Sequence, residues 1–582
     1  MNPTQYEEEF SLKGYFIPFT SVKAIIFIVL IGFAVFFNSF FNGFVGDDWG
    51  QIVDNVPVHS LQNTFSFFTK STFYVNGAGS FGAYYKPFML VIYSVLYTFF
   101  GQTAFFYHLV QSSIHIANAC LLFIFFKYFF DRKLSFFLSL TFLVHPINSE
   151  AVYYVACMQE VLFFLFGIIA ILVMNKKSNI RNTLIIGILW FFSLLSKETG
   201  TLFIVISSLY NHLFKKTYSI YGVAGVVLVS YMLLRVSAVG FNLSKNEMYL
   251  TANSTFSERL ISIPKIVFFY LYSFMSPFNR TIQQSWVVRE VDLKNFYSPL
   301  IADLTFLLAL TLLAVYFYKK NTKIFREYIF FFIWFLLGLT LHLQIIPLDA
   351  VVSDRWFYFP IVGLIGIIGV LLSYFWEVTK TDLIKKIFII ISISVVILLM
   401  YLSFMRGFDF RNDFTLCSHD INIDQKNYVL ELCLGNEYRK LKQFDIARTH
   451  FKKSISFFPK YYIAMYYLGL SYSDQNNYKE AIKYFRQTLD NNNWGYGADQ
   501  LATLLSYHGG YKEAKTVATE NLEKQPRNAQ LWYALALSDY QLGDKEKALS
   551  AAKNAYLIAP NNLTKQLYEG IQEGLPLKFD GR

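Results

Sequence analysis

Two adjacent carboxylates, Asp47 and Asp48, lie just beyond the first apolar segment of the sequence, Lys23 to Phe41. Charge close to membrane hydrocarbon is costly and tends to be kept for function. A carboxylate at a membrane surface suits general-base work on a hydroxyl group, and a neighbouring carboxylate raises the pKa of that base or orients the acceptor. The pair is therefore the first candidate for chemistry. The alternative is a solvated loop that only ends a helix.

Other charged or polar residues stand at the ends of later apolar runs. Arginine suits a phosphate leaving group through bidentate contact, and lysine suits it as a point charge. Glycosyl transfer from a lipid-phosphate sugar requires a base, a hydroxyl acceptor and cations that bind the phosphate, all on one side of a membrane. Composition alone does not favour this reaction over transport. The residues that we expect to converge with the aspartates are Lys86, His145, Glu150, Lys197, Glu198, Asp354 and Arg355.

The elements that must position these residues follow from the composition along the chain. Hydrophobic residues make up 54% of the 582 residues, and apolar runs long enough to span a bilayer recur up to about Leu402. The basic residues, which give a formal net charge of +11, cluster between these runs, as in cytoplasmic loops, and form no continuous nucleic-acid-binding face. The sequence predicts an all-α protein in which a polytopic membrane bundle precedes a soluble helical tail.

The basic clusters also predict the topology. The run from Lys23 should be an uncleaved first span that leaves Asp47 and Asp48 outside. Two further apolar runs would place later basic clusters on the extracytoplasmic side if they crossed the membrane. We therefore interpret these runs, Pro87–Phe100 and Ile261–Met275, as interfacial or re-entrant helices. About eleven spans remain, and they place the tail on the same side as the aspartates. The predicted segments are a cytoplasmic N-terminus at 1–23, a membrane domain at 24–405 with its first outer loop at 42–103, a linker at 406–427, four repeats at 428–562 and a tail at 563–582.

The four cysteines have no zinc-binding spacing, so a structural metal site is not expected. Cys417 and Cys433 can pair in an oxidising compartment, and free thiols are the default expectation. No cofactor is required by the sequence. A divalent cation at Asp47 and Asp48 is left open, because two carboxylates alone make a weak site.

A 34-residue period begins near Asn427 and is typical of tetratricopeptide helix pairs. Small residues let paired helices approach closely, large residues fill the space between repeats, and the stack leaves a groove suited to a peptide or partner protein. The recurring positions are Leu434-Gly435, Ala447, Phe451 and Pro459, then Leu468-Gly469, Ala481 and Phe485, then Leu501, Ala514, Ala518 and Pro526, and finally Leu535, Ala548, Ala552 and Pro560.

Taken in order, the motifs of the chain resemble those of one membrane-enzyme family. They are Asp47-Asp48 with Ile52 and Asn55, Tyr85-Lys86-Pro87, Tyr107-His108-Leu109-Val110 with His115, residues 145–152 (HPINSEAV), residues 195–200 (LSKETG) and residues 354–360 (DRWFYFP). With the repeat tail, this set resembles the transmembrane and tetratricopeptide-repeat (TMTC) protein O-mannosyltransferases, within the C-type (GT-C) membrane glycosyltransferases.

The resemblance implies a polyprenol- or dolichol-phosphate sugar donor and transfer of a hexose, such as mannose, to Ser or Thr of an exported protein. It implies Asp47 as the base and Asp48 as its partner or an acceptor ligand. Lys86 stands where the family more often has Arg, and Asp354 where Glu is more usual. By the same resemblance Arg355, Lys197 and Lys86 would bind the donor phosphate, and His145, Glu150, Glu198 and Asp354 would shape the pocket.

Each of these residues also has a structural interpretation. His108 and His115 lie on one helix face, where packing is favoured over metal binding. Lys197 suits an interfacial anchor and His145-Pro146 a helix stop. Glu150 could face open solvent, and Arg355 could pair with Asp354.

Three other functions compete with transfer to protein. The acceptor could be a glycolipid or a cell-surface polymer, or the chain could be a non-catalytic membrane scaffold whose repeats assemble a complex. A transporter would place charges near mid-membrane and repeat its spans, and neither feature is found. The partners expected are a lipid-linked sugar, an acceptor protein or peptide held by the repeats, and membrane lipid, with no nucleic acid.

Overall fold

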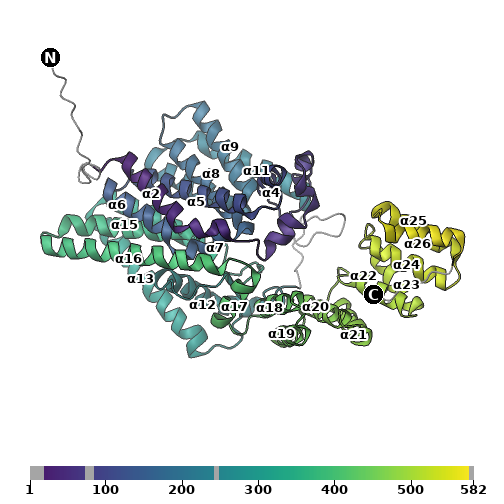
Figure 1. Cartoon of the computed structure of the whole chain (residues 1–582). Helices are drawn as coiled ribbons and strands as arrows, with labels where there is room; N and C mark the ends of the chain where they lie inside the picture. Colours follow the sequence, from purple (N-terminus) through teal and green to yellow (C-terminus); the bar gives the residue numbers. More distant parts are fainter. Residues whose placement is uncertain (1–18, 73–83, 241–247, 576–582) are drawn as a thin grey trace, which may run out of the picture.

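The computed structural model describes residues 19–72, 84–240 and 248–575, which are mostly helical. The chain forms a bundle of long helices followed by a row of shorter helix pairs that extends away from one end of the bundle (Figure 1). This is the all-α architecture that the sequence predicts. The only strands among the described residues are β1 (Gln283–Gln284) and β2 (Val352–Ser353), which pair antiparallel.

The apolar runs of the sequence fold as the helices of the bundle. Polar side chains of Thr20, Asp131, Asn179 and Asn321 cap the first turns of four of them, and these caps fix where the helices begin. The bundle helices are α2 (Ser21–Val35), α3 (Thr64–Phe67), α4 (Pro87–Phe100), α5 (Ala104–Phe126), α6 (Arg132–Val144), α7 (Ser149–Tyr153), α8 (Met158–Met174), α9 (Ile180–Ser196), α10 (Thr201–Tyr210), α11 (Ser219–Val239), α12 (Phe256–Met275), α13 (Ser298–Lys320), α14 (Thr322–Thr340), α15 (Pro360–Val378) and α16 (Asp382–Asp409).

Among the residues that the structure describes, six helical segments are long and apolar enough to cross a membrane, so the chain is a membrane protein. They are Ala104–Phe126, Val155–Met174, Ser219–Val239, Leu293–Lys320, Pro360–Val378 and Asp382–Asp409, and the shorter apolar helices are α2, α4 and α9. The predicted number of about eleven spans, and the side of the membrane on which each loop lies, stay predictions. The same holds for the interfacial placement of α4 and of the segment within α12.

Aromatic side chains fill much of the bundle core. Phe331 of α14 lies in ring contact with Phe129 and Phe130, just beyond the end of α5. Gly363 of α15 lies directly against the backbone of Phe335, so a side chain there would collide with α14. This close approach brings the start of α15, which follows Arg355, firmly against the core.

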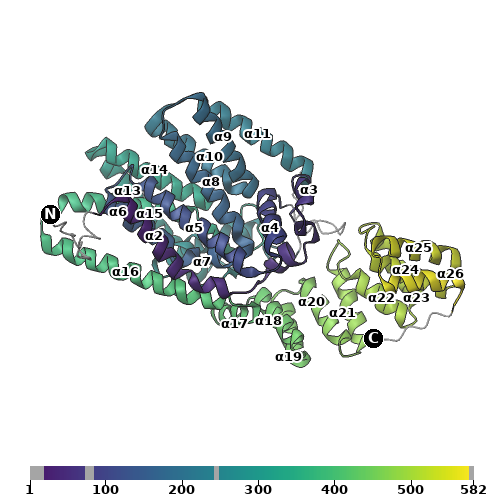
Figure 2. The ribbon, with the colours of Figure 1, turned by 45° about the horizontal axis from the view of Figure 1, so that its top comes forward.

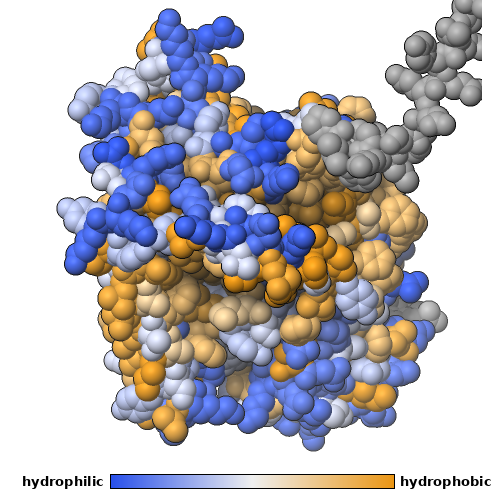
Figure 3. All heavy atoms as spheres, turned by 90° about the vertical axis from the view of Figure 1, so that its left-hand side faces the viewer, coloured by the Kyte–Doolittle hydropathy of each residue, from blue (hydrophilic) through white to orange (hydrophobic). Residues whose placement is uncertain are grey.

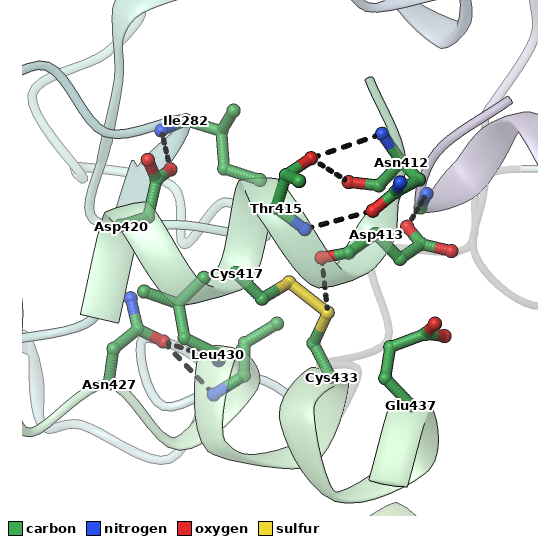
Figure 4. The surroundings of a disulfide bond; sticks show 12 residues. Ile282, Asn412, Asp413, Thr415, Cys417, Asp420, Asn427, Leu430, Cys433 and Glu437 are labelled. Atoms are coloured by element: carbon green, nitrogen blue, oxygen red, sulfur yellow. Dashed lines mark hydrogen bonds between the residues drawn. A yellow bond between two sulfur atoms is a disulfide. The ribbon is translucent and has the colours of Figure 1, made fainter. Parts of the chain in front are cut away.

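Helix α17 (Asp413–Ile423) joins the bundle to the tail and lies within the predicted linker. A disulfide between Cys417 and Cys433 ties α17 to α18 (Figure 4). The default expectation of free thiols at these two positions was therefore wrong. The pairing is the alternative that the sequence allowed for an oxidising compartment, and it forms because the fold places α17 beside α18.

The tail is a solenoid of helix pairs, as the 34-residue period predicts. Gly435 and Gly469 each face the ring of a phenylalanine on the paired helix, Phe451 and Phe485, so the missing side chain makes room for the ring. Figure 2 shows the row of pairs leaving the bundle beside the end of α16. The helices are α18 (Tyr428–Lys440), α19 (Phe444–Phe457), α20 (Tyr462–Ser473), α21 (Tyr478–Asp490), α22 (Ala498–Tyr507), α23 (Tyr511–Leu522), α24 (Ala529–Gln541), α25 (Lys545–Ile558) and α26 (Asn562–Glu573).

Candidate active site

The two aspartates have different surroundings. Asp48 is fully buried, and its carboxylate accepts hydrogen bonds from the backbone N–H groups of Val45, at 3.0 Å, and Ala156, at 2.5 Å. Burial raises the pKa of Asp48 well above its ordinary value, and the two N–H groups oppose this shift. Asp48 therefore fixes the shape of its own loop and fastens the loop to the segment before α8.

Asp47 is exposed to solvent, and its side chain is available for contact with a ligand. Its backbone N–H donates to the Tyr154 hydroxyl at 2.6 Å, and that hydroxyl also hydrogen-bonds the Asp47 carboxylate. The pKa of Asp47 is raised, mainly because surrounding protein displaces water, while the charge of Arg355 opposes the rise most strongly. A carboxylate with a raised pKa suits a general base that works near neutral pH.

The turn before Asp47 requires glycine. Gly46 has a φ of +51°, and a Cβ at this position would lie 2.6 Å from the Tyr154 hydroxyl oxygen. Both the left-handed backbone and the contact exclude a side chain. The turn thus brings Asp47 beside Tyr154.

Asp413, at the start of α17, holds this turn from the tail side. Its carboxylate accepts from the Gly46 N–H at 2.7 Å and from the Trp49 indole N–H at 3.2 Å. Because α17 is joined to α18 by the disulfide, the loop of Asp47 is connected to the first repeat helix.

Arg355 approaches the site from the chain that follows β2. Its backbone N–H and its guanidinium donate to the two carboxylate oxygens of buried Glu150, at 2.8 and 2.9 Å. The guanidinium also lies 3.4 Å from Asp349. Glu150 therefore does not face open solvent; burial raises its pKa to about 7, and Arg355 opposes that rise.

Asp354 does not pair with Arg355. Its two carboxylate oxygens accept from the guanidinium of Arg280, at 2.8 and 2.9 Å, and both residues are buried. Consecutive residues thus point to different partners, because both lie in a 3-10 helix, Asp354–Phe357, that begins directly after β2. The geometry gives Asp354 a structural role and leaves Arg355 closer to the candidate site.

Lys197 is paired as well. Its ammonium lies 2.5 Å from Glu160 in the first turn of α8, and both side chains are buried. A buried pair of this kind is not a membrane-surface anchor. Glu198, the next residue, is exposed, and its charge acts on Lys86.

Lys86 is the least neutralised of the three candidate phosphate ligands. It is buried just before α4, with its ammonium 5.0 Å from the centre of the Tyr84 ring. Within residues 19–72, 84–240 and 248–575, no carboxylate lies within 4.0 Å of that ammonium. Burial lowers the pKa of Lys86, the charge of Glu198 opposes this shift, and Lys197 and Arg355 lower the pKa further.

The charged groups therefore converge. Arg355 and Lys86 both act on the ionisation of Asp47, and Lys197 acts on that of Lys86. The exposed carboxylate of Asp47 is thus within electrostatic reach of Lys86, before α4, and Arg355, before α15, while Lys197, after α9, is within reach of Lys86. This arrangement can bind a phosphate next to a base.

The three histidines named from the sequence, His108, His115 and His145, all contact backbone groups of neighbouring segments. His145 ends α6, accepts from the Ile147 N–H through Nδ1, contacts the Phe274 carbonyl through Nε2, and stacks on the Phe274 ring. It is the helix stop that the sequence allowed for. Inside α5, His108 contacts the Gly43 carbonyl, and His115 contacts Tyr358 and the Leu143 carbonyl.

Sequence reasoning missed several residues of the site. Asp349, Tyr154, Glu160 and Asp413 touch or pair with the residues that it named. Glu160 carried a signal, because a carboxylate at the start of an apolar run is unusual. The other three lie in loops or at a helix start, and nothing in their sequence neighbourhoods points to the aspartates. In the described part of the chain, no group of three or more His, Cys, Asp or Glu residues is arranged to hold a metal ion.

Comparison with known proteins finds similarity over most of the chain. A model of the tetratricopeptide-repeat family matches residues 433–493 and 500–562. A human protein, O-mannosyl-transferase TMTC3, is 23% identical over 503 residues, which cover 79% of this chain and 54% of that protein. The chain is similar to TMTC3. The mouse TMTC3 protein is 22% identical over 519 residues, with the same two shares covered.

The similarity to TMTC3 is longer than either part of the chain alone, so it extends across both the bundle and the repeats. It supports the resemblance drawn from the motifs. The chain spans about half the length of the TMTC3 proteins that it matches.

Among solved structures, YrrB, described as a TPR protein with an unusual peptide-binding site, is 20% identical and has a TM-score of 0.24 over 28% of this chain and 83% of its own. Yeast Tom70 is 13% identical and has a TM-score of 0.26 over 80% of this chain and 96% of its own.

Proposed function

We propose that the protein is a membrane glycosyltransferase that moves a hexose from a polyprenol- or dolichol-phosphate donor to Ser or Thr hydroxyls of exported protein. The observation that carries the proposal is the exposed carboxylate of Asp47, whose pKa responds to the charges of Arg355 and Lys86. The similarity to TMTC3, a protein O-mannosyl-transferase by name, supports the same reaction class.

In the proposed reaction, Asp47 accepts the proton of the acceptor hydroxyl as its oxygen attacks the anomeric carbon of the donor sugar. The bond between that carbon and the lipid-phosphate oxygen breaks, the phosphate leaves with the electron pair, and the configuration at the carbon is inverted. Lys86 and Arg355 stabilise the negative charge that develops on the phosphate, because charged donors strengthen hydrogen bonds to an anion. Asp48 acts indirectly by holding the loop.

We place the reaction on the extracytoplasmic side, either outside the cell or in the lumen of the endoplasmic reticulum. The predicted topology supports this side, and so does the Cys417–Cys433 disulfide, since disulfides persist in oxidising compartments. The tail lies close to the site, because α17 contacts the loop of Asp47 through Asp413. We propose that the repeats hold or orient the acceptor protein.

The test compares cells carrying the wild-type chain with cells carrying Asp47→Asn at equal membrane abundance, by intact-mass glycoproteomics of exported proteins. Loss of hexose additions at Ser and Thr is expected, with a fall in rate of about 100- to 10,000-fold in a reconstituted assay, the range for losing a general base. Asp54→Asn is the matched control, because Asp54 is exposed in the same loop.

Other results would point elsewhere. If the glycoproteome were unchanged while glycolipids or cell-surface polymers were altered, the acceptor would be a glycolipid or polymer and not a protein. If glycoproteins, glycolipids and polymers were all unchanged while deletion of the repeats gave a phenotype, the scaffold function would be favoured.

A further inference from the structure

A large apolar groove lies at the end of the bundle opposite to Asp47. It encloses about 1080 Å³ between α6, α15 and α16, and its wall is mostly hydrophobic, including Phe136, Phe137, Leu372, Ile393 and Met400. Figure 3 looks onto this end of the molecule, where hydrophobic surface lies between hydrophilic groups. None of the candidate site residues lines the groove.

The groove exists because the first half of α16 stands away from the bundle. The buried residues of α16 begin at Val396, and none of the residues from Asp382 to Val395 is buried. Near the start of the helix, Phe388 contacts Phe375 of α15, and the Lys385 ammonium lies 5.2 Å from the centre of the Trp376 ring. These contacts hold α16 against α15 along one edge of the groove, and the space between α16 and α6 stays unfilled by side chains.

The depth of the groove matches one leaflet of a bilayer. Its wall runs from Arg132 to Leu140 on α6 and from Phe388 to Met400 on α16. At 1.5 Å per residue these stretches are about 12 and 18 Å long. Half of the hydrocarbon thickness of a membrane is about 15 Å. The groove is therefore long enough for an acyl chain that enters from the end away from Asp47, and too short to cross the membrane.

Basic side chains stand at the entrance. Arg132 and Lys133 are exposed there, and Arg132 donates one N–H to the Phe19 carbonyl at 2.6 Å. Asp131 also lines the entrance, but one of its carboxylate oxygens accepts from the Lys133 and Leu134 N–H groups and so caps α6. Within the ranges that the structure describes, no carboxylate lies within 4.0 Å of Arg132 or Lys133, although Glu377 also lines the groove. The two cations remain available to an anion.

We propose that this groove binds an anionic phospholipid from the leaflet opposite to the candidate active site. Its acyl chain would lie between α6 and α16, and its phosphate would contact Arg132 and Lys133. Burial of apolar surface favours binding of the acyl chain in the groove. Attraction between the basic pair and the headgroup selects an anionic lipid over a zwitterionic one. The proposal does not depend on the proposed transferase function.

The test uses the purified full-length protein and native mass spectrometry with phosphatidylglycerol and phosphatidylcholine of equal chain length. We expect the wild-type protein to retain phosphatidylglycerol preferentially. The Arg132→Gln/Lys133→Gln variant should bind it about 30-fold more weakly, since each basic group near a lipid headgroup contributes about a fivefold preference. Lys176→Gln/Lys177→Gln is the control, because it removes the basic pair after α8 and leaves the groove intact.

A second variant tests the groove itself. Ile393→Trp adds bulk to its wall and should reduce retention of both lipids, while the lipid preference of any remaining binding is kept. Equal binding of the two lipids by the wild-type protein would overturn the proposal, as would equal losses in the two double variants. Displacement of phosphatidylglycerol by a polyprenyl phosphate at equal or lower concentration would also overturn it, because the groove would then belong to the donor. Size-exclusion profiles and thermal unfolding confirm that each variant is folded.

Discussion

Glu150 and Arg355 are 205 residues apart in sequence and form one two-point contact, in which a single carboxylate receives both the backbone N–H and the guanidinium of the arginine. The contact fixes the direction of the Arg355 side chain and also compensates its charge. A second guanidinium nitrogen of Arg355 is thereby directed towards Asp349. Arg355 reaches the neighbourhood of Asp47 because a buried acid holds it there.

The first prediction concerns pH and Glu150. Its raised pKa of about 7 means that the carboxylate gains a proton, and loses its charge, as the pH falls through 7. The contact with Arg355 then weakens, so transferase activity should fall in the same range. Glu150→Gln should show lower activity at pH 8. Its activity should also lack the decrease near pH 7 that protonation of Glu150 causes in the wild-type protein. The measurement is kcat/KM against pH, and an unchanged profile in Glu150→Gln would contradict the assignment.

Stability should depend on pH in the opposite direction. Between the ordinary Glu pKa near 4.5 and the folded value near 7, the folded protein binds more protons at Glu150 than the unfolded chain does. The free energy of unfolding should therefore decrease as the pH rises through this window, and the contribution is fully present below 4.5. Thermal unfolding of the wild-type protein and of Glu150→Gln from pH 4.5 to 8 measures the difference.

The second prediction ranks the phosphate ligands. Lys86 has no carboxylate within ion-pair distance among the described residues, whereas Lys197 is paired with Glu160. Lys86→Gln should raise the KM for the lipid donor by about tenfold or more, the size expected for a lost charged hydrogen bond. Lys86→Arg should retain most of the affinity, and Lys479→Gln, in an exposed part of the tail, is the control. An unchanged donor KM in Lys86→Gln would remove Lys86 from the phosphate site.

The third prediction tests the positioning role of Asp413. Asp413→Asn keeps the shape of the side chain but weakens its bonds to Gly46 and Trp49. Because the loop of Asp47 is then held less firmly, kcat should fall by about tenfold while the donor KM stays close to the wild-type value. Asp445→Asn, which alters an exposed acid in α19, serves as the matched control. A rise in donor KM as large as the fall in kcat would contradict this positioning role.

The fourth prediction separates Asp354 from the chemistry. Asp354→Asn leaves the buried guanidinium of Arg280 without its charged partner, and removing one member of a buried pair costs about 3–5 kcal/mol. Thermal stability should therefore drop clearly. Protein that stays folded should keep its donor KM, since Asp354 does not face the donor. Replacing both residues, with Arg280→Met and Asp354→Leu, should recover much of the stability. A selective rise in donor KM would instead assign Asp354 to the pocket.

The sequence by itself determined the helical architecture, the repeats and the types of residue that gather near the site. Apolar length and helix-capping residues are local properties, so α4 begins and ends at the same residues as the predicted run Pro87–Phe100. The repeat positions follow equally from local spacing, because Gly435 and Phe451 recur as Gly469 and Phe485.

Only the tertiary structure decided which charges are available. Asp47 and Asp48 are neighbours in sequence, yet one is exposed and the other is used by two backbone N–H groups. Asp354 and Arg355 look like a pair and are bound to Arg280 and Glu150 instead. Burial and long-range partners set these roles, since the free energy of a charged group depends on what the fold places around it, and adjacency in sequence does not encode those contacts.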